Sequence, residues 1–152
     1  MAAVNRKTVR LQFASLLSTA LTGGSLAQAV LAYLPATLGN KSPVVAVAGA
    51  GTERERAHLG ANTWLTWVYL QVVVFVLYSE DSSGTWTRAL AETRLDDLEA
   101  AICDVVMANK TLAGYWDALY FDGPSALEGP LPISGVPYVL ETYRVKARVI
   151  NG

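Results

Sequence analysis

Few residues of this chain could act as nucleophiles, general bases or metal ligands. His58 is the only histidine and Cys103 is the only cysteine. His58 lies in a charged, glycine-rich stretch, and no cysteine or acid is spaced to complete a catalytic relay with it. Cys103 falls beside apolar residues of an expected helix, which favours a buried or half-buried thiol over a nucleophile. A single cysteine also excludes an intramolecular disulfide and multi-cysteine metal sites, and we expect no cofactor.

Two further patterns could carry chemistry, and each has a simpler interpretation. Asp96 and Asp97 form a carboxylate pair of the kind used in general acid–base catalysis, but they fit the polar face of an amphipathic helix. The stretch from Gly49 to Gly51 follows an expected strand, yet it lacks the third glycine and the Gly-Lys-Ser/Thr pattern of phosphate-binding loops. We therefore expect that the protein is not an enzyme.

Aromatic and basic residues indicate a contact surface instead. The four tryptophans could stack on nucleic-acid bases, but basic residues are not interleaved with them along the chain. Alternation in the last expected strand places three cations on one face, opposite an apolar face. That row is either a solvent-facing strand paired with acids or a surface for a subunit, DNA or an acidic partner. With the charged run that precedes His58, the candidate contact residues are Glu53, Arg54, Glu55, Arg56, Arg144, Lys146 and Arg148.

The composition indicates one domain with a surplus of apolar residues. The chain has 152 residues, of which 52% are hydrophobic and 16% charged. This length fits a single domain, residues 1–152, and the low charge excludes a disordered chain. The apolar residues are more numerous than one small domain can bury in its core. We therefore expect part of the apolar surface to contact other copies or partners. The net charge of −1 gives no global attraction to a polyanion.

Two helices and several strands are expected. Apolar residues spaced three and four apart predict helices from about Val4 to Leu21, ended by Gly23-Gly24, and from about Thr85 to Asn109. Residues 63–78 are apolar on both faces, which predicts a long central strand. Shorter strands are expected at 44–47, 115–121 and 138–150, with a strand or short helix at 27–34. Residues 49–60 are expected to form a solvated loop or hairpin arm, and 122–137 a loop. The expected fold class is α+β, with two helices packed on one face of a mostly antiparallel sheet.

Export and membrane insertion are not expected. The first residues carry the cations of a signal peptide, but Gln12, Ser15 and the pair Gly23-Gly24 interrupt its apolar part. The longest apolar run, within residues 68–77, is too short to span a membrane.

The order of these elements resembles a known family. The similarity covers most of the chain: an amphipathic helix at the start, the segment Lys41–Val47 leading into the charged arm, the long strand from Trp64 to Tyr78, the helix around Arg94–Ile102 and the closing strand from Tyr138. In this order and size the chain is similar to the tail-terminator proteins of long-tailed bacteriophages, also called tail-completion or head-to-tail joining proteins.

The resemblance implies a structural role in a virion. A subunit of this family belongs to a ring, expected to be hexameric, that caps the tail tube, ends its polymerisation and joins it to the head. The expected partners are other copies of the chain, the tail-tube protein and a head-completion or connector protein, and DNA would pass through without sequence-specific binding. The expected location is the head-proximal end of the tail, after assembly in the host cytoplasm. A neck or head-completion protein and a small peptide- or nucleic-acid-binding module remain alternatives, with an enzyme third.

Overall fold

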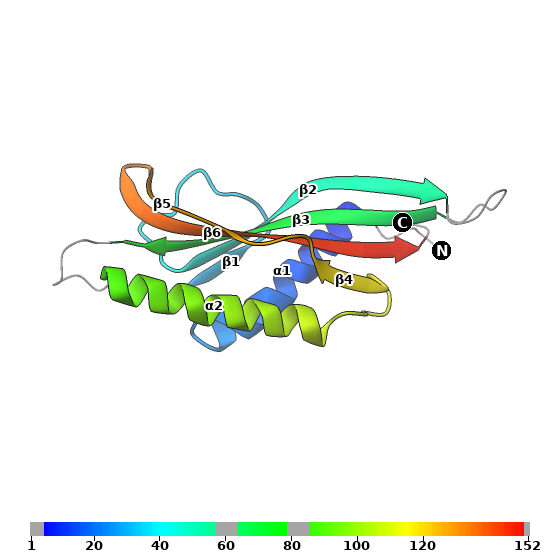
Figure 1. Ribbon diagram of the computed structural model, residues 1–152, viewed down its shortest axis with the longest axis horizontal. Helices are drawn as coiled ribbons and strands as arrows, with labels where there is room; N and C mark the ends of the chain where they lie inside the picture. Colours follow the sequence, from blue (N-terminus) through cyan, green and yellow to red (C-terminus); the bar gives the residue numbers. More distant parts are fainter. Residues whose placement is uncertain (1–4, 57–63, 79–85, 151–152) are drawn as a thin grey trace.

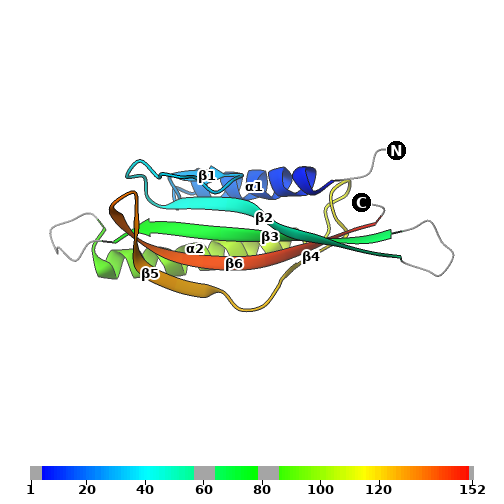
Figure 2. The ribbon, with the colours of Figure 1, turned by 90° about the horizontal axis from the view of Figure 1, so that it is seen from above.

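A computed structural model describes residues 5–56, 64–78 and 86–150 of the chain. The elements in chain order are α1 (Arg6–Gly23), β1 (Ala29–Leu31), β2 (Val44–Arg56), β3 (Trp64–Leu77), α2 (Arg88–Ala108), β4 (Ala118–Phe121), β5 (Ala126–Ile133) and β6 (Val136–Ile150). The strands of these described residues form one mostly antiparallel sheet, and both helices pack on one of its faces (Figures 1 and 2). The expected α+β class is confirmed.

The sheet has the order β1-β2-β3-β6-β4, and β5 also pairs with β6. β1 runs parallel to β2, and the other pairs are antiparallel. β4 and β5 share one edge of β6, because β5 pairs with its first half as far as Thr142 and β4 pairs with its second half from Val145. One lateral edge of the sheet is therefore β1 with β2, and the opposite edge is β5 with β4.

Both helices begin at polar caps and bury one face. The Asn5 side chain accepts a hydrogen bond from the backbone N–H of Thr8 at 2.9 Å, and Thr87 accepts one from Leu90 at 3.3 Å. The stripe expected for α2 is buried throughout: Ala91, Leu95, Leu98, Ile102 and Val105. In α1 the buried residues are Val9, Phe13, Ala14, Leu17 and Leu21. Ala20, expected on that stripe, is exposed, because burial follows the i, i+4 spacing from Val9.

β3 is central, as expected, with β2 on one side and β6 on the other. Its residues Val72, Val74 and Val76 join the core beneath the helices. Val73 and Phe75 point the other way, into a second cluster with buried side chains from the segment after β1 and from the start of β6. Helices thus cover one face of β3, and loop and hairpin residues cover part of the other.

The stretch from Gly49 to Arg56 is not a solvated loop, because β2 continues through it and pairs with β3 as far as Trp64. A bulge between Gly49 and Gly51, where Gly51 has a φ of 125°, shifts the register and lets the pairing continue. The alternative expectation, a hairpin arm, is therefore correct for the described residues. The remainder of that stretch, with His58, lies outside them.

The expected loop at 122–137 is also a correction, because most of it is β5 and its turn into β6. Ser134 and Gly135 have φ values of 52° and 80°, the pair of positive angles that a tight two-residue hairpin turn requires. The prolines in β5 obscured this strand in the sequence. They are tolerated because β5 lies at the edge of the sheet. β4, in contrast, is shorter than expected and begins at Ala118.

Candidate functional site

The sheet face opposite the helices gathers most of the expected contact residues. Alternation along the paired strands places their side chains together on this face, because Glu53 pairs with Trp67 and Trp67 pairs in turn with Arg148. Tyr69 pairs with Lys146, which also pairs with Tyr120 of β4. We call this surface the open face, defined by Glu53, Glu55, Trp67, Tyr69, Tyr120, Arg144, Lys146 and Arg148.

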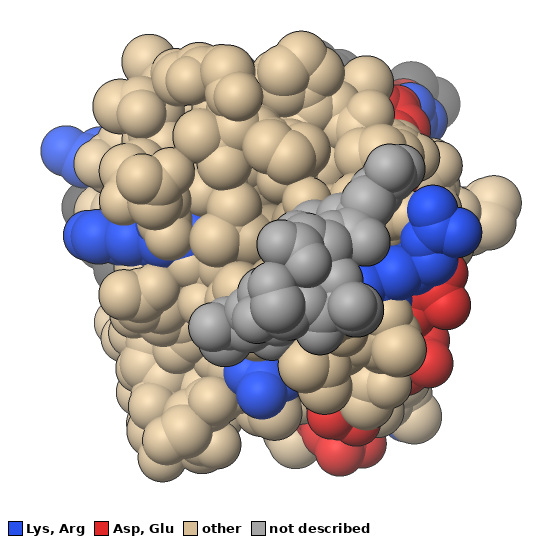
Figure 3. Space-filling view, turned by 90° about the vertical axis from the view of Figure 1, so that its left-hand side faces the viewer, with Lys and Arg blue, Asp and Glu red and all other residues tan. Residues whose placement is uncertain are grey.

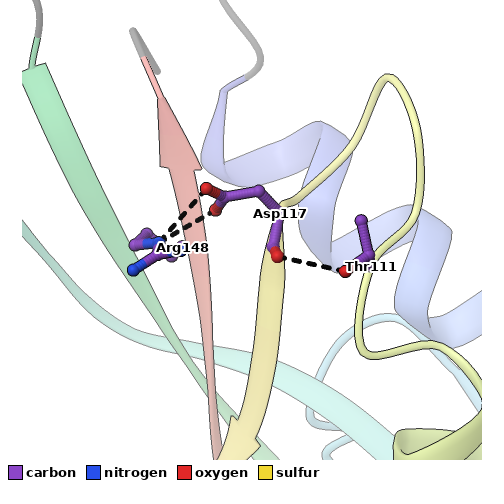
Figure 4. A network of polar contacts seen from close by, with 3 residues as sticks. All are labelled: Thr111, Asp117 and Arg148. Carbon is purple, nitrogen blue, oxygen red and sulfur yellow. Dashed lines mark hydrogen bonds and ion pairs between the residues drawn. The ribbon is translucent and has the colours of Figure 1, made fainter.

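Arg148 is held by Asp117, at the start of the β4 edge. Its Nε donates to both carboxylate oxygens of Asp117 at 3.1 and 3.2 Å, and the Asp117 backbone N–H donates to the Arg148 carbonyl at 2.9 Å. The Asp117 carbonyl in turn accepts from the Thr111 hydroxyl at 3.2 Å (Figure 4). The hydrogen bond with Asp117 raises the pKa of Arg148 above its usual value. This cation is therefore oriented and partly neutralised within its own subunit.

Trp67 lies beneath two of the three cations. Lys146 Nζ is 5.1 Å and the Arg148 guanidinium carbon 5.8 Å from the centre of its ring, both within the range of cation–π attraction. The Tyr120 ring lies 6.4 Å away, and Asp122 is 3.9 Å from Lys146. Basic residues that are not interleaved with the tryptophans along the chain thus reach Trp67 in space, because β3 and β6 are far apart in sequence and adjacent in the sheet.

The acidic side of the open face comes from β2. The Tyr69 hydroxyl donates to Glu53 at 2.9 Å, and this hydrogen bond to the carboxylate raises the pKa of Tyr69. Arg144 is exposed and lines a shallow pocket of about 280 Å³ with Tyr69 and Asp122. Acidic, aromatic and basic side chains therefore follow one another across β2, β3 and β6.

The charged run of β2 is divided between the two faces of the strand. Glu53 and Glu55 pair with Trp67 and Leu65 and share the open face. Arg54 pairs with Thr66, which is buried on the opposite face, so Arg54 belongs to that face. The backbone of Arg56 pairs with Trp64. Glu53, Arg54 and Glu55 therefore do not form one patch, because neighbours along a strand point in opposite directions.

A second candidate site is a groove of about 840 Å³ between α2 and the β5–β6 hairpin. Leu95, Leu127 and Val139 supply its apolar surface. Its acidic residues are Glu92, Asp96, Glu99, Glu128 and Glu141. The sequence placed the first three on a solvated helix face, which the structure confirms, but it gave no indication that β5 and β6 add two more acids.

Glu141 is the one buried acid of this groove, with 7% of its surface exposed. It accepts hydrogen bonds from the Tyr143 hydroxyl at 2.6 Å and from the Ser125 hydroxyl at 2.8 Å. Burial, followed by the hydrogen bond to Glu141, strongly raises the pKa of Tyr143. Glu141 interrupts the apolar face of β6, and that interruption was the available indication of a polar partner.

The other residues considered for chemistry, Cys103 and Trp116, lie outside the open face. Cys103 is half-buried, as expected, and lines a small pocket beside Glu99 and Tyr143. Trp116 is buried and donates to the Asn109 carbonyl at 2.7 Å, so it packs rather than offering a stacking surface. Within residues 5–56, 64–78 and 86–150, no three His, Cys, Asp or Glu side chains are placed to hold a metal ion. Over the same residues, no helix has the length and apolar character needed to cross a membrane.

Comparison with known proteins leaves the function to be argued from this geometry. No model of a known protein family matches the chain, and no curated protein matches it either. The two candidate sites are both shallow and charged. On the open face the charged side chains pair and stack with their neighbours, and in the groove acids surround exposed apolar side chains, arrangements suited to contacts with a macromolecular surface.

Proposed function

We propose that this protein is a tail-terminator subunit of a long-tailed bacteriophage, which joins other copies in a ring, caps the tail tube and ends its polymerisation. The ring is expected to be hexameric and to present its other side to the head connector. The observation that carries the proposal is the open face, where charged side chains are already paired and stacked within one subunit.

The pairing on the open face supports a protein contact over a nucleic-acid contact. Lys146 and Arg148 face Asp122 and Asp117, which reduces the positive charge that phosphates would meet. Only a third or so of each of these four side chains is exposed, so the pairs are partly shielded from water. These ion pairs fix the positions of the charged side chains, and a fixed pattern of charges can complement the charges of a protein partner.

The β2–β3 hairpin supports the same proposal by its reach. Beyond the bulge at Gly51 the two strands run past the helices (Figures 1 and 2). A strand pair that leaves the body of the domain can contact a neighbouring subunit or the end of the tube. The acids Glu53 and Glu55 lie on this part of the hairpin.

A surface poor in charge lies at the opposite end of the molecule. Seen from that end, a broad area lacks Lys, Arg, Asp and Glu (Figure 3). Exposed apolar side chains in the segment after β1 and in β5 include Tyr33, Leu34 and Leu131, with exposed fractions of 61%, 51% and 39%. The Ser134 hydroxyl, in the turn after β5, donates a long hydrogen bond of 3.5 Å to the Ala36 carbonyl in the segment after β1. Exposed apolar residues on a small domain are typical of a surface that binds a partner.

Deleting the gene from the phage that carries it, and imaging the particles by electron microscopy, tests the proposal. We expect overlong or ragged tails that are not attached to filled heads, and restoration of normal tails by the wild-type gene on a plasmid. Tails of normal length beside leaking heads would contradict termination and would place the protein on the head side of the joint. Normal, infectious particles would contradict a role in the virion.

A further inference from the structure

Charge is distributed very unevenly between the two lateral edges of the sheet. The segment 5–56, which forms α1, β1 and β2, contains six basic and two acidic residues, a formal charge of +4. The segment 86–141, which forms α2, β4, β5 and the start of β6, contains three basic and nine acidic residues, a formal charge of −6. The near-neutral chain therefore carries a basic edge and an acidic edge on opposite sides.

The acidic edge is the groove between α2 and β5. Its exposed acids Glu92, Asp96 and Glu99 lie on the flank of α2 that faces β5, and Glu128 adds a fourth from β5 itself. Leu127, 66% exposed, stands among them. The result is an apolar side chain surrounded by negative charge, the arrangement of a small interface with a polar rim.

The basic edge has the complementary composition. Arg6 and Lys7 are exposed in the first turn of α1, and the Arg6 side chain lies over β2, about 3.9 Å from the position that a Cβ on Gly49 would take. Leu11, one turn after Lys7, is 44% exposed. Lys41 is exposed at the other end of this edge, before β2 begins. Here an exposed leucine is accompanied by positive charge.

The cations of α1 stand where they disfavour the isolated helix. The first turn of a helix has unpaired N–H groups and a partial positive charge, so Arg6 and Lys7 are repelled there, and no acid occupies that turn. Their position is therefore not explained by the stability of α1. A neighbour that supplies negative charge at this edge would remove the repulsion.

Seen from the end where β5 turns into β6, the left margin, on the side of α1 and β1, shows Lys or Arg atoms and no acidic atoms (Figures 2 and 3). Acidic atoms gather towards the right and the bottom, on the side of α2 and β5, where further Lys or Arg atoms accompany them (Figures 2 and 3). Surfaces of opposite sign on opposite sides of one subunit attract each other head to tail.

We propose that the occupant of the acidic edge is the basic edge of a second copy of this chain, so that α2 and β5 of one subunit contact α1 and the start of β2 of the next. The inference rests on the proposed ring and names its subunit contact. Each subunit uses both edges once, and a heterologous contact of this kind closes into a ring when the rotation between neighbours permits.

The contact is made by side chains rather than by joining strands. β1 is only three residues long, and β5 carries Pro130 and Pro132, which cannot donate to a neighbouring strand. β1 and β5 therefore resist strand addition, whereas charged side chains over them can meet an opposite surface. We therefore expect association to weaken as salt is raised.

Charge-reversed variants test this contact. Variant A carries Arg6→Glu, Lys7→Glu and Lys41→Glu, so both of its edges are acidic. Variant B carries Glu92→Lys, Asp96→Lys and Glu99→Lys, which puts three cations in the groove and raises the formal charge of segment 86–141 from −6 to 0. Lys110→Glu, a reversal at an exposed position after α2, is the matched control for a charge change away from either edge.

The readout is zero-length carbodiimide cross-linking of mixed ¹⁵N-labelled and unlabelled protein, analysed by mass spectrometry, with sedimentation of the same samples. For the wild type and Lys110→Glu we expect intermolecular links from Lys7 or Lys41 to acids of α2 or β5. For variants A and B alone we expect sedimentation to show at least a tenfold weaker association, since like edges then face each other; sedimentation is the readout here because the substitutions also remove the groups that the carbodiimide joins. An equal mixture of A and B should restore association, because each reversed edge meets an opposite one.

Failure of the mixture to associate, or unchanged association of variant A alone, would overturn the contact. So would the lack of any intermolecular link between the two edges in the wild type up to about 1 mM, the range of weak complexes. Restoration by mixing also shows that both variants are folded. If the contact is found but gene deletion leaves tails normal, the proposed function fails and the contact stands. If normal tails depend on the protein but the cross-links between the two edges are missing, the contact fails and the proposed function stands.

Discussion

Glu141 shows how one buried carboxylate shapes its surroundings. It lies on the face of β6 that packs beneath the helices, where its neighbours in the pattern are apolar. Two hydroxyls, from Tyr143 and Ser125, donate to it at 2.6 and 2.8 Å. A buried carboxylate is costly without such donors, so the hydrogen bond from Tyr143 stabilises Glu141 in the core. The same hydrogen bond makes the Tyr143 hydroxyl harder to deprotonate.

The response to alkaline pH tests this pair. Burial and the hydrogen bond to Glu141 raise the pKa of Tyr143, so the folded chain keeps this proton at pH values where the unfolded chain, with a tyrosine pKa near 10, releases it. The free energy of unfolding should therefore fall above about pH 10, by about 1.4 kcal/mol per pH unit for each such group. Urea denaturation between pH 8 and 11.5 measures the slope.

Tyr143→Phe is the comparison for that slope. The variant should lose about 1.5–3 kcal/mol of stability at pH 7, because a donor to a buried carboxylate is gone, and its decline above pH 10 should be shallower than that of the wild type. Tyr69 and Tyr138, whose pKa values are also raised, retain part of the slope. Equal slopes in the two proteins would contradict the role assigned to Tyr143.

At the scale of elements, α2 has one face that packs against the sheet and another that is exposed in the acidic groove. Its buried stripe faces the sheet, and its exposed flank carries the acids of the groove. The two faces coexist because one helix turn presents each side to a different environment. Mutations on the stripe should therefore alter folding, and mutations on the flank should alter association.

A pair of identical substitutions in α2 tests this separation. Leu98 is fully buried and Leu90 is 52% exposed. Leu98→Ala should lower the free energy of unfolding by about 2–5 kcal/mol, because it leaves a cavity in the core. Leu90→Ala should change it by about 0.5 kcal/mol or less, as surface substitutions usually do. Urea unfolding of both variants is the measurement, and similar losses would show that the helix is not packed as described.

At the scale of the whole molecule, the two faces and the two lateral edges of the sheet differ in cover and in charge. One face is covered by helices, the opposite face is partly open, and the two lateral edges carry opposite charge. In the proposed ring, each subunit would contact its neighbours through its edges, and its open face and hairpin would remain available to other partners. The division follows from the topology, because both helices lie on the same side of the sheet.

Arg144 provides the test at this scale. It is exposed on the open face, whereas Arg148 is tied to Asp117. Arg144→Glu should leave the melting temperature within about 2 °C of the wild type, as expected for a surface change, and should reduce plaque formation in a gene-deleted phage complemented with the variant at least tenfold. Arg148→Glu should also cost stability of about 1 kcal/mol, since a partly exposed ion pair is lost.

Lys110→Glu is again the control, because it reverses an exposed cation away from the open face. Its plaque count should match that of the wild type. Full complementation by a folded Arg144→Glu protein would remove the open face from the assembly mechanism and would leave the edges as the contact surfaces to pursue.

The sequence alone was enough to predict the two helices, the central strand and the α+β class. These features depend on local periodicity: the i, i+4 stripe of α2 and the uninterrupted apolar run of β3 can be recognised without knowing their neighbours. Alternation in β6 likewise predicted that Arg144, Lys146 and Arg148 share a face. Local patterning also predicted that Cys103 is buried or half-buried, and it is half-buried.

Tertiary structure decided what depends on partners distant in the sequence. β5 was missed because its prolines suggest a loop, and only pairing with β6 makes it an edge strand. The contacts of Lys146 and Arg148 with Trp67, and of Arg148 with Asp117, join strands separated by tens of residues. The acidic groove likewise exists only because α2 and β5 lie side by side. Local sequence sets the face on which a side chain lies, but sheet pairing sets which side chain it meets.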